Sequence, residues 1–272
     1  MMQLATGQMT PKDNRTPVTV QCKVYWIHRH EWNVQWIAQY HAAAPSLAKE
    51  IQARKVDMSK LDSEPIDGSP TGGNEANRFT CEDFAFEVLI EFASRNKLPL
   101  KIRTDSATFK NIDKDYKSGS KTAPPTPAGF ALDVAYASGA PDVLKNSSPV
   151  ADSDLLPGDL FVEFNGGHIQ VVTGVAPSKI DIMQGNFPGP GETPKRKWTS
   201  YLELGPWLRS TNDGNRESPN YLGAPVQGAS YEQRGGKWMY QRHYGNYQDW
   251  DSDVWGTMNK HVRWNFAEFN NL

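Results

Sequence analysis

The sequence predicts an α+β protein, in which helices pack with a small antiparallel sheet. A strongly helical segment begins at Cys81, and three short strand-like runs follow one another between Leu160 and Met183. The 22 glycines and 19 prolines predict long loops between these elements. With 272 residues, the chain is long enough to bury a sizeable core, as one large domain or one and a half ordinary ones.

The first 60 residues (1–60) are predicted to form an N-terminal extension. Residues 1–18 are polar and read as a flexible lead-in, whereas residues 18–27 have the composition of a strand. A helix is expected from about Glu31 to Arg54, and Pro45 is expected to interrupt it. Its apolar residues at helical spacing are Trp36, Ile37 and Tyr40.

A core over residues 61–190 contains the best helix of the chain. It starts at or just before Cys81, with Thr80 as a plausible N-cap and Asp83 three residues later. Pro99 marks its end, because proline cannot continue a helix. The apolar face of this helix is formed by Phe84, Leu89, Ile90 and Phe92.

The rest of the core is predicted to be an antiparallel meander. A polar insertion near residues 104–128 is expected at the surface, and a short helix is expected over residues 131–137. After a turn at Leu156–Asp159, the strand candidates are residues 160–164, 168–175 and 179–183. Residues 191–272 form an aromatic-rich C-terminal extension, which we expect to pack on the core rather than to line a groove for a sugar or peptide.

The composition excludes several classes of protein. The formal net charge of −2 gives no overall field for nucleic acid or an anionic membrane. The 9 tryptophans, 10 tyrosines and 11 phenylalanines argue against wholesale disorder. No run approaches the roughly 20 apolar residues of a membrane-spanning helix. We therefore expect a soluble protein with no nucleic-acid partner and no membrane span.

The cysteines and histidines predict neither a disulfide framework nor a metal site. Cys22 and Cys81 are too few for a four-cysteine zinc site, and nothing in the local sequence supports a bridge between them. His28 and His30 form an H-x-H pair without a third ligand nearby, so we predict no metal and no cofactor. The N-terminus lacks the basic region and apolar run of a Sec signal peptide.

Three residues could form a catalytic arrangement. A cysteine at a helix N-terminus, as predicted for Cys81, has its thiolate stabilised by the helix dipole and by free N–H groups. His168 follows the Gly166-Gly167 turn and opens a strand, where it could take the thiol proton. Gln184 or Asn186, at the end of the next strand, could orient the imidazole. A lone helical cysteine is more often a small buried hydrophobe, but the position at the helix start favours catalysis here.

These motifs resemble those of a known family. Ser69–Gly73 followed by Phe79-Thr80-Cys81 resembles the loop and nucleophile of the NlpC/P60 papain-like peptidoglycan hydrolases. Leu156–Phe161 followed by Gly167-His168-Ile169 resembles their histidine motif. Ile182–Asn186 looks closer to the third motif of the related CHAP amidases. The order and spacing of the three motifs carry the resemblance, which covers about a quarter of the chain.

The resemblance implies a papain-like fold and a cysteine amidase or endopeptidase. Cys81 would attack an amide carbonyl, His168 would act as base and then acid, and Gln184 or Asn186 would orient the ring. The implied substrate is the peptidoglycan stem peptide. Without a Sec signal, this activity fits a phage lysin or an antibacterial effector exported by a machine such as a type VI secretion system. An effector would act in the periplasm or cell wall of the target and would imply an immunity protein and a secretion-machine component as partners.

The sequence departs from the family at the nucleophile, where Thr80-Cys81-Glu82-Asp83 stands in place of the usual Asp-Cys-Ser-Gly. The two carboxylates favour a helix N-terminus but oppose a nearby thiolate. Two other functions therefore remain open. One is a papain-like deamidase or transglutaminase-type toxin that acts on a protein target, and the other is a non-catalytic module that binds a glycan or a protein.

Overall fold

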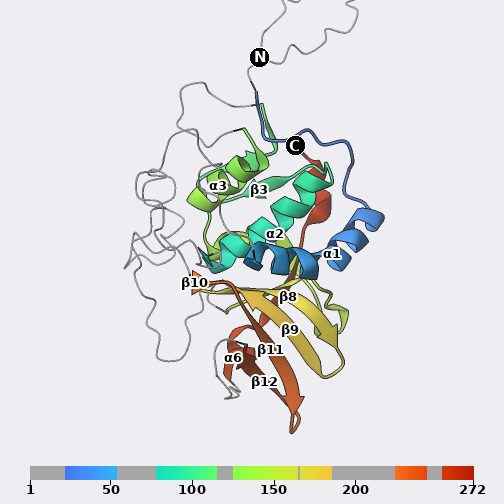
Figure 1. Ribbon diagram of the computed structural model, residues 1–272, viewed down its shortest axis with the longest axis vertical. Helices are drawn as coiled ribbons and strands as arrows, with labels where there is room; N and C mark the ends of the chain where they lie inside the picture. Colours follow the sequence, from blue (N-terminus) through green and yellow to red (C-terminus); the bar gives the residue numbers. More distant parts are fainter. Residues whose placement is uncertain (1–21, 54–77, 115–124, 165, 186–223, 244–252) are drawn as a thin grey trace, which may run out of the picture.

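A seven-stranded antiparallel sheet organises the molecule (Figure 1). The structure is a computed structural model, and it describes residues 22–53, 78–114, 125–164, 166–185, 224–243 and 253–272. The strands of the sheet lie in the order β12–β11–β9–β8–β7–β13–β6. Their bounds are β6 Ser147–Pro149, β7 Leu160–Val162, β8 Ile169–Ala176, β9 Lys179–Gln184, β11 Gln227–Arg234, β12 Lys237–Arg242 and β13 Lys260–Trp264.

Helices cover both faces of this sheet. The two longest, α1 and α2, lie side by side over one face, and the short helix α6 lies against β12 on the other (Figure 1). The helix bounds are α1 Val34–Ala53, α2 Cys81–Arg95, α3 Pro127–Ala137, α4 Ala140–Lys145 and α6 Asp253–Thr257, with 3₁₀ turns at Asp152–Asp154 and Phe266–Asn270. Three two-stranded ladders complete the described fold, namely β1 (Lys23–Val24) with β5 (Ile112–Asp113), β3 (Lys101–Arg103) with β4 (Thr108–Lys110), and β2 (Arg78–Phe79) with β10 (Ala224–Pro225).

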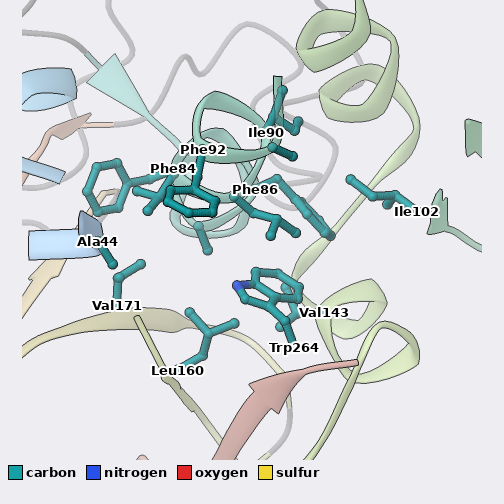
Figure 2. Close-up of a cluster of buried hydrophobic side chains, with 14 of the residues drawn as sticks. Ala44, Phe84, Phe86, Ile90, Phe92, Ile102, Val143, Leu160, Val171 and Trp264 are labelled. Atoms are coloured by element: carbon teal, nitrogen blue, oxygen red, sulfur yellow. The ribbon is translucent and has the colours of Figure 1, made fainter. Parts of the chain in front are cut away.

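The alternation of side chains along the strands divides the core in two. On β7, Leu160 and Val162 join the cluster under α2, whereas Phe161 between them joins a second cluster on the opposite face. Figure 2 shows Phe84 and Phe86 of α2 within the first cluster, together with the side chains of Leu160, Val171 and Trp264 from the sheet. The amphipathic face of α2 thus fixes the helix on the sheet, and with it the position of Cys81.

The main sequence predictions for the core are confirmed. Helix α2 begins at Cys81 after Thr80, which is the N-cap although its side chain makes no capping hydrogen bond. Strands β7, β8 and β9 form the expected antiparallel meander. Strand β8 begins at Ile169, so His168 lies immediately before the strand instead of opening it. The predicted lead-in over residues 1–18 and the loop containing Ser69–Gly73 lie outside the described residues.

One expectation about the helices is wrong. Helix α1 continues through Pro45, because burying its face, including Ala44 and Ile51, offsets the roughly 3 kcal/mol that an internal proline costs. The stretch expected as a polar surface insertion contains β4 and β5, and residues 105–108 in it are exposed, whereas Asn111 is fully buried. The Asn111 side chain donates to the Trp26 carbonyl and accepts from the Leu100 N–H, so a polar residue here holds the core together.

The turn before β7 is fixed by a buried ion pair. Asp159 is fully buried, and Arg263 of β13 donates to both of its carboxylate oxygens at 2.7 Å. Gly158 adopts φ +89°, and a Cβ there would lie 2.6 Å from the Tyr40 ring. The Leu156 N–H also donates to Asp159, at 2.8 Å. These contacts hold the meander against α1 and the C-terminal strand.

Replacing Arg263 by methionine should strongly destabilise the fold. The Asp159 carboxylate would stay buried without its cation, a loss of about 3–5 kcal/mol in the free energy of unfolding, measured by urea denaturation. Lys179→Met is the control, because Lys179 pairs with Asp181 at the exposed surface and such pairs contribute about 0–1 kcal/mol. Equal losses in the two variants would contradict the assignment.

Candidate active site

Cys81 lies where the N-terminus of α2 meets the start of β8. Its side chain is buried, with 2% of the residue exposed. The thiol donates to Oε2 of Glu82 at 3.1 Å, and the backbone N–H of Ile169 points to the sulfur. Ile169 directly follows His168 in the chain, so the sulfur contacts the segment that carries the predicted base.

The surroundings favour the neutral thiol. Burial raises the pKa of Cys81 well above its usual value, and the charge of Glu82 and the hydrogen bond to Glu82 raise it further. The Ile169 N–H opposes this effect, and Asp83 adds to it. The expectation of a lowered thiol pKa at the helix N-terminus is therefore wrong, because burial and the two carboxyl groups raise the pKa of Cys81.

The two carboxyl groups beside Cys81 are also held toward their neutral forms. Burial is the largest cause of the raised pKa of Glu82, and the charge of Asp142 adds to it. Burial and then the charge of Glu82 raise the pKa of Asp83 well above its usual value. The start of α2 therefore disfavours the accumulation of negative charge.

His168 is buried and neutral. It follows the turn that contains Gly166 at φ +76°, and its carbonyl accepts from the N–H of Glu163 at 2.9 Å across the turn. Burial lowers the pKa of His168 to about 4, the hydrogen bond to Gln184 opposes this shift, and Arg242 adds to it. At neutral pH the imidazole is therefore unprotonated and able to accept a proton.

Gln184, the last residue of β9, contacts the imidazole. Its Oε1 lies 2.9 Å from Nε2 of His168, and its side chain is fully buried. Because a carbonyl oxygen only accepts hydrogen bonds, the proton of the neutral ring lies on Nε2. The basic nitrogen is then Nδ1. The other predicted orienting residue, Asn186, lies outside the described residues.

Further polar residues around Gln184 were missed by the sequence analysis. Gln170 donates from Nε2 to Oε1 of Gln184 at 2.9 Å, and Gln184 donates to the Tyr240 hydroxyl at 2.5 Å. Tyr231 in turn donates to Oε1 of Gln170 at 2.6 Å. Gln170 could have been found from the sequence, because residues two apart along a strand lie on the same face and Gln170 is two residues after His168. Tyr231 and Tyr240 could not, because they come from strands far along the chain.

The described residues contain no group of three histidine, cysteine, aspartate or glutamate side chains that could hold a metal ion. His28 contacts Asn111, and the His30 ring packs on Trp36. Cys22 and Cys81 are both free thiols. None of the helices in the described part of the chain has the length and apolar character that crossing a bilayer requires.

Comparisons with protein-family models, with curated proteins and with solved structures find no match to this chain. Its function is therefore inferred from the geometry of Cys81, His168 and Gln184 and from the motifs around them.

The Glu82→Gln variant should make Cys81 more reactive. The amide can still accept from the thiol but carries no charge, so the thiol pKa should fall and alkylation at neutral pH should become faster. The measurement is the pH dependence of Cys81 alkylation, followed by mass spectrometry. Glu91→Gln, which removes a partly buried carboxylate of α2 that pairs with Arg95 away from Cys81, is the matched control. An unchanged midpoint in Glu82→Gln would contradict the role of its charge.

Proposed function

We propose that this protein is a cysteine hydrolase that cleaves an amide bond, with Cys81 as nucleophile, His168 as base and Gln184 as the orienting residue. The observation that carries the proposal is the hydrogen bond between His168 and Gln184 at the place where β8 reaches the Cys81 sulfur. A cysteine at a helix N-terminus, packed on an antiparallel sheet that supplies the histidine and its partner, is the arrangement expected of a papain-like core.

In the proposed reaction, the Cys81 thiol turns from Glu82 to Nδ1 of His168 and transfers its proton there. The thiolate attacks the amide carbonyl, and the backbone N–H of Cys81 helps to stabilise the oxyanion. The imidazolium then protonates the leaving amine, and a thioester on Cys81 remains. Water hydrolyses the thioester, with His168 as base, and this step regenerates the thiol.

Peptidoglycan stem peptide is the substrate that we propose, and the support for it is the resemblance of the three motifs to NlpC/P60 and CHAP hydrolases. Such an enzyme would act as an antibacterial effector or a lysin. As an effector it would be delivered without a Sec signal to the periplasm or cell wall of a target cell, and the producing cell would need an immunity protein.

A non-catalytic binding module is the second candidate function. The observation in its favour is the buried, hydrogen-bonded thiol of Cys81, whose pKa is raised. A structural cysteine has these properties, whereas an activated nucleophile has a lowered pKa.

Digestion of purified peptidoglycan sacculi tests the proposal. The wild type should release soluble fragments whose masses identify the cleaved bond, and Cys81→Ser and His168→Ala should be slower by about 10⁴-fold or more. Cys22→Ser should match the wild type. If the folded wild type releases no fragments, the wall substrate is wrong, and protein substrates should then be examined for cleavage or for glutamine deamidation. If Cys81 acts on neither substrate, the binding module is favoured.

The pH dependence of the reaction should report the environment of His168. Because the pKa of His168 lies at about 4, its base form persists to that pH, and the acidic limb of kcat/KM should lie near pH 4. Gln184→Glu places a carboxylate against Nε2, favours the imidazolium and should move the limb to higher pH. NMR titration of His168 measures the same shift directly. Gln35→Glu, which adds a charge on the exposed start of α1, should leave the limb unchanged.

A further inference from the structure

The hydroxyl group of Thr80, the residue before Cys81, is buried and has no hydrogen-bond partner in the described part of the chain. Thr80 is the N-cap of α2, with φ −67° and ψ 165°, but its side chain does not cap the helix. Only 4% of the residue is exposed. Because buried polar groups in proteins are nearly always hydrogen-bonded, this hydroxyl beside the candidate nucleophile is an exception.

Thr126 shows what a threonine at this position usually does. It is the N-cap of α3, and its Oγ1 accepts from the Gly129 N–H at 3.1 Å. Such a bond satisfies one of the N–H groups that the start of a helix leaves without an intrahelical partner. Thr80 has the same side chain at the same position of α2, yet its hydroxyl accepts nothing from the helix. Capping therefore does not account for the Thr80 hydroxyl.

The surroundings of Thr80 leave its hydroxyl available as a donor. Burial raises the pKa of Glu82 and of Asp83, and the nearby Thr80 hydroxyl opposes both shifts. The hydroxyl thus lies close to two carboxyl groups, but it is aligned for a hydrogen bond with neither. Since a hydroxyl rotates about its C–O bond, its proton can be directed to another oxygen. The backbone N–H of Cys81 is attached to the Thr80 carbonyl carbon, so the two donors are neighbours.

Attack by a thiolate on a carbonyl group creates a negatively charged oxygen. When the bond from sulfur to carbon forms, an electron pair of the carbonyl double bond moves to the oxygen. When the intermediate collapses, the pair returns and the bond to the leaving group breaks. Donors aimed at this oxygen stabilise the transition state, and one donor contributes about 10²–10³-fold to kcat. An oxyanion hole commonly combines a backbone N–H with a second donor.

We propose that the Thr80 hydroxyl is this second donor, which forms a hydrogen bond to the carbonyl oxygen when Cys81 attacks. Thr80 is then a catalytic residue, and its unsatisfied hydroxyl in the resting site is a donor held for the transition state. The inference rests on the proposed role of Cys81 as nucleophile. It does not depend on a peptidoglycan substrate, because attack of the sulfur on any carbonyl group produces the same oxyanion.

The test compares two reactions of Cys81 in the full chain, in a Cys22→Ser background that leaves Cys81 as the remaining thiol. Acylation by p-nitrophenyl acetate passes through an oxyanion and releases p-nitrophenolate, whereas alkylation by iodoacetamide displaces iodide from a saturated carbon. Thr80→Val removes the hydroxyl at nearly constant shape and should slow acylation by about 10²-fold. Alkylation should not slow, because the lost hydroxyl no longer favours negative charge on the neighbouring carboxyl groups. Thr80→Ser should keep most of the acylation rate.

Thr126→Val is the matched control. It removes a hydroxyl that caps α3, so it should lower the midpoint of urea unfolding and leave the acylation of Cys81 unchanged. Thr80→Val should not lower the midpoint, because its hydroxyl makes no hydrogen bond within the described residues. Thr80→Ala provides the same comparison of acylation with alkylation if Thr80→Val does not fold.

Three results would overturn the inference. They are equal slowing of acylation and alkylation in Thr80→Val, no slowing of either reaction, and a background protein that is alkylated at Cys81 but never acylated. If acylation depends on Thr80 but neither sacculi nor proteins are cleaved, the oxyanion role stands and the proposed amide hydrolase fails.

Discussion

The packing of α2 on the seven-stranded sheet is the constraint on which the candidate site depends. The aromatic side chains of the helix fill the space above β7 and β8, so the first residue of the helix, Cys81, is held against the start of β8. Because the Asp159–Arg263 pair fixes the turn before β7, the same meander also positions His168 and Gln184. The chemistry of the site is therefore set by packing contacts several residues away from it.

Burial determines the charge state of the site. It raises the pKa of Cys81 and of the two carboxyl groups after it, and it lowers the pKa of His168. All four shifts favour the uncharged form, which is the expected response to a low-dielectric environment. Burial thus disfavours charge on all four groups, and the Cys81 thiol has to lose its proton before it acts as a nucleophile.

The sequence predicted the parts of this structure that depend on local pattern. Helix α2, its N-cap at Thr80 and the meander from β7 to β9 follow from spacing and turn residues. The strand order could not be predicted from local pattern, because β13, which is far along the chain, lies between β7 and β6. For the same reason, Gln184 could be named as a candidate from its place after His168, whereas Tyr231 and Tyr240 could not be assigned to the His168 network.

Glu82 accepts a hydrogen bond from the Cys81 thiol, and Gln184 accepts one from the His168 ring. The two residues have opposite effects on proton transfer from Cys81 to His168. Glu82 holds the thiol proton and disfavours the thiolate, whereas Gln184 leaves Nδ1 of His168 ready to accept that proton. An ion pair of thiolate and imidazolium would place two further charges in a buried site, at a penalty of several kcal/mol per ion before their attraction is counted. A resting state with a neutral thiol and a neutral imidazole is therefore favoured, and proton transfer is best coupled to attack on a substrate carbonyl, where the negative charge passes to an oxygen that backbone N–H groups can stabilise.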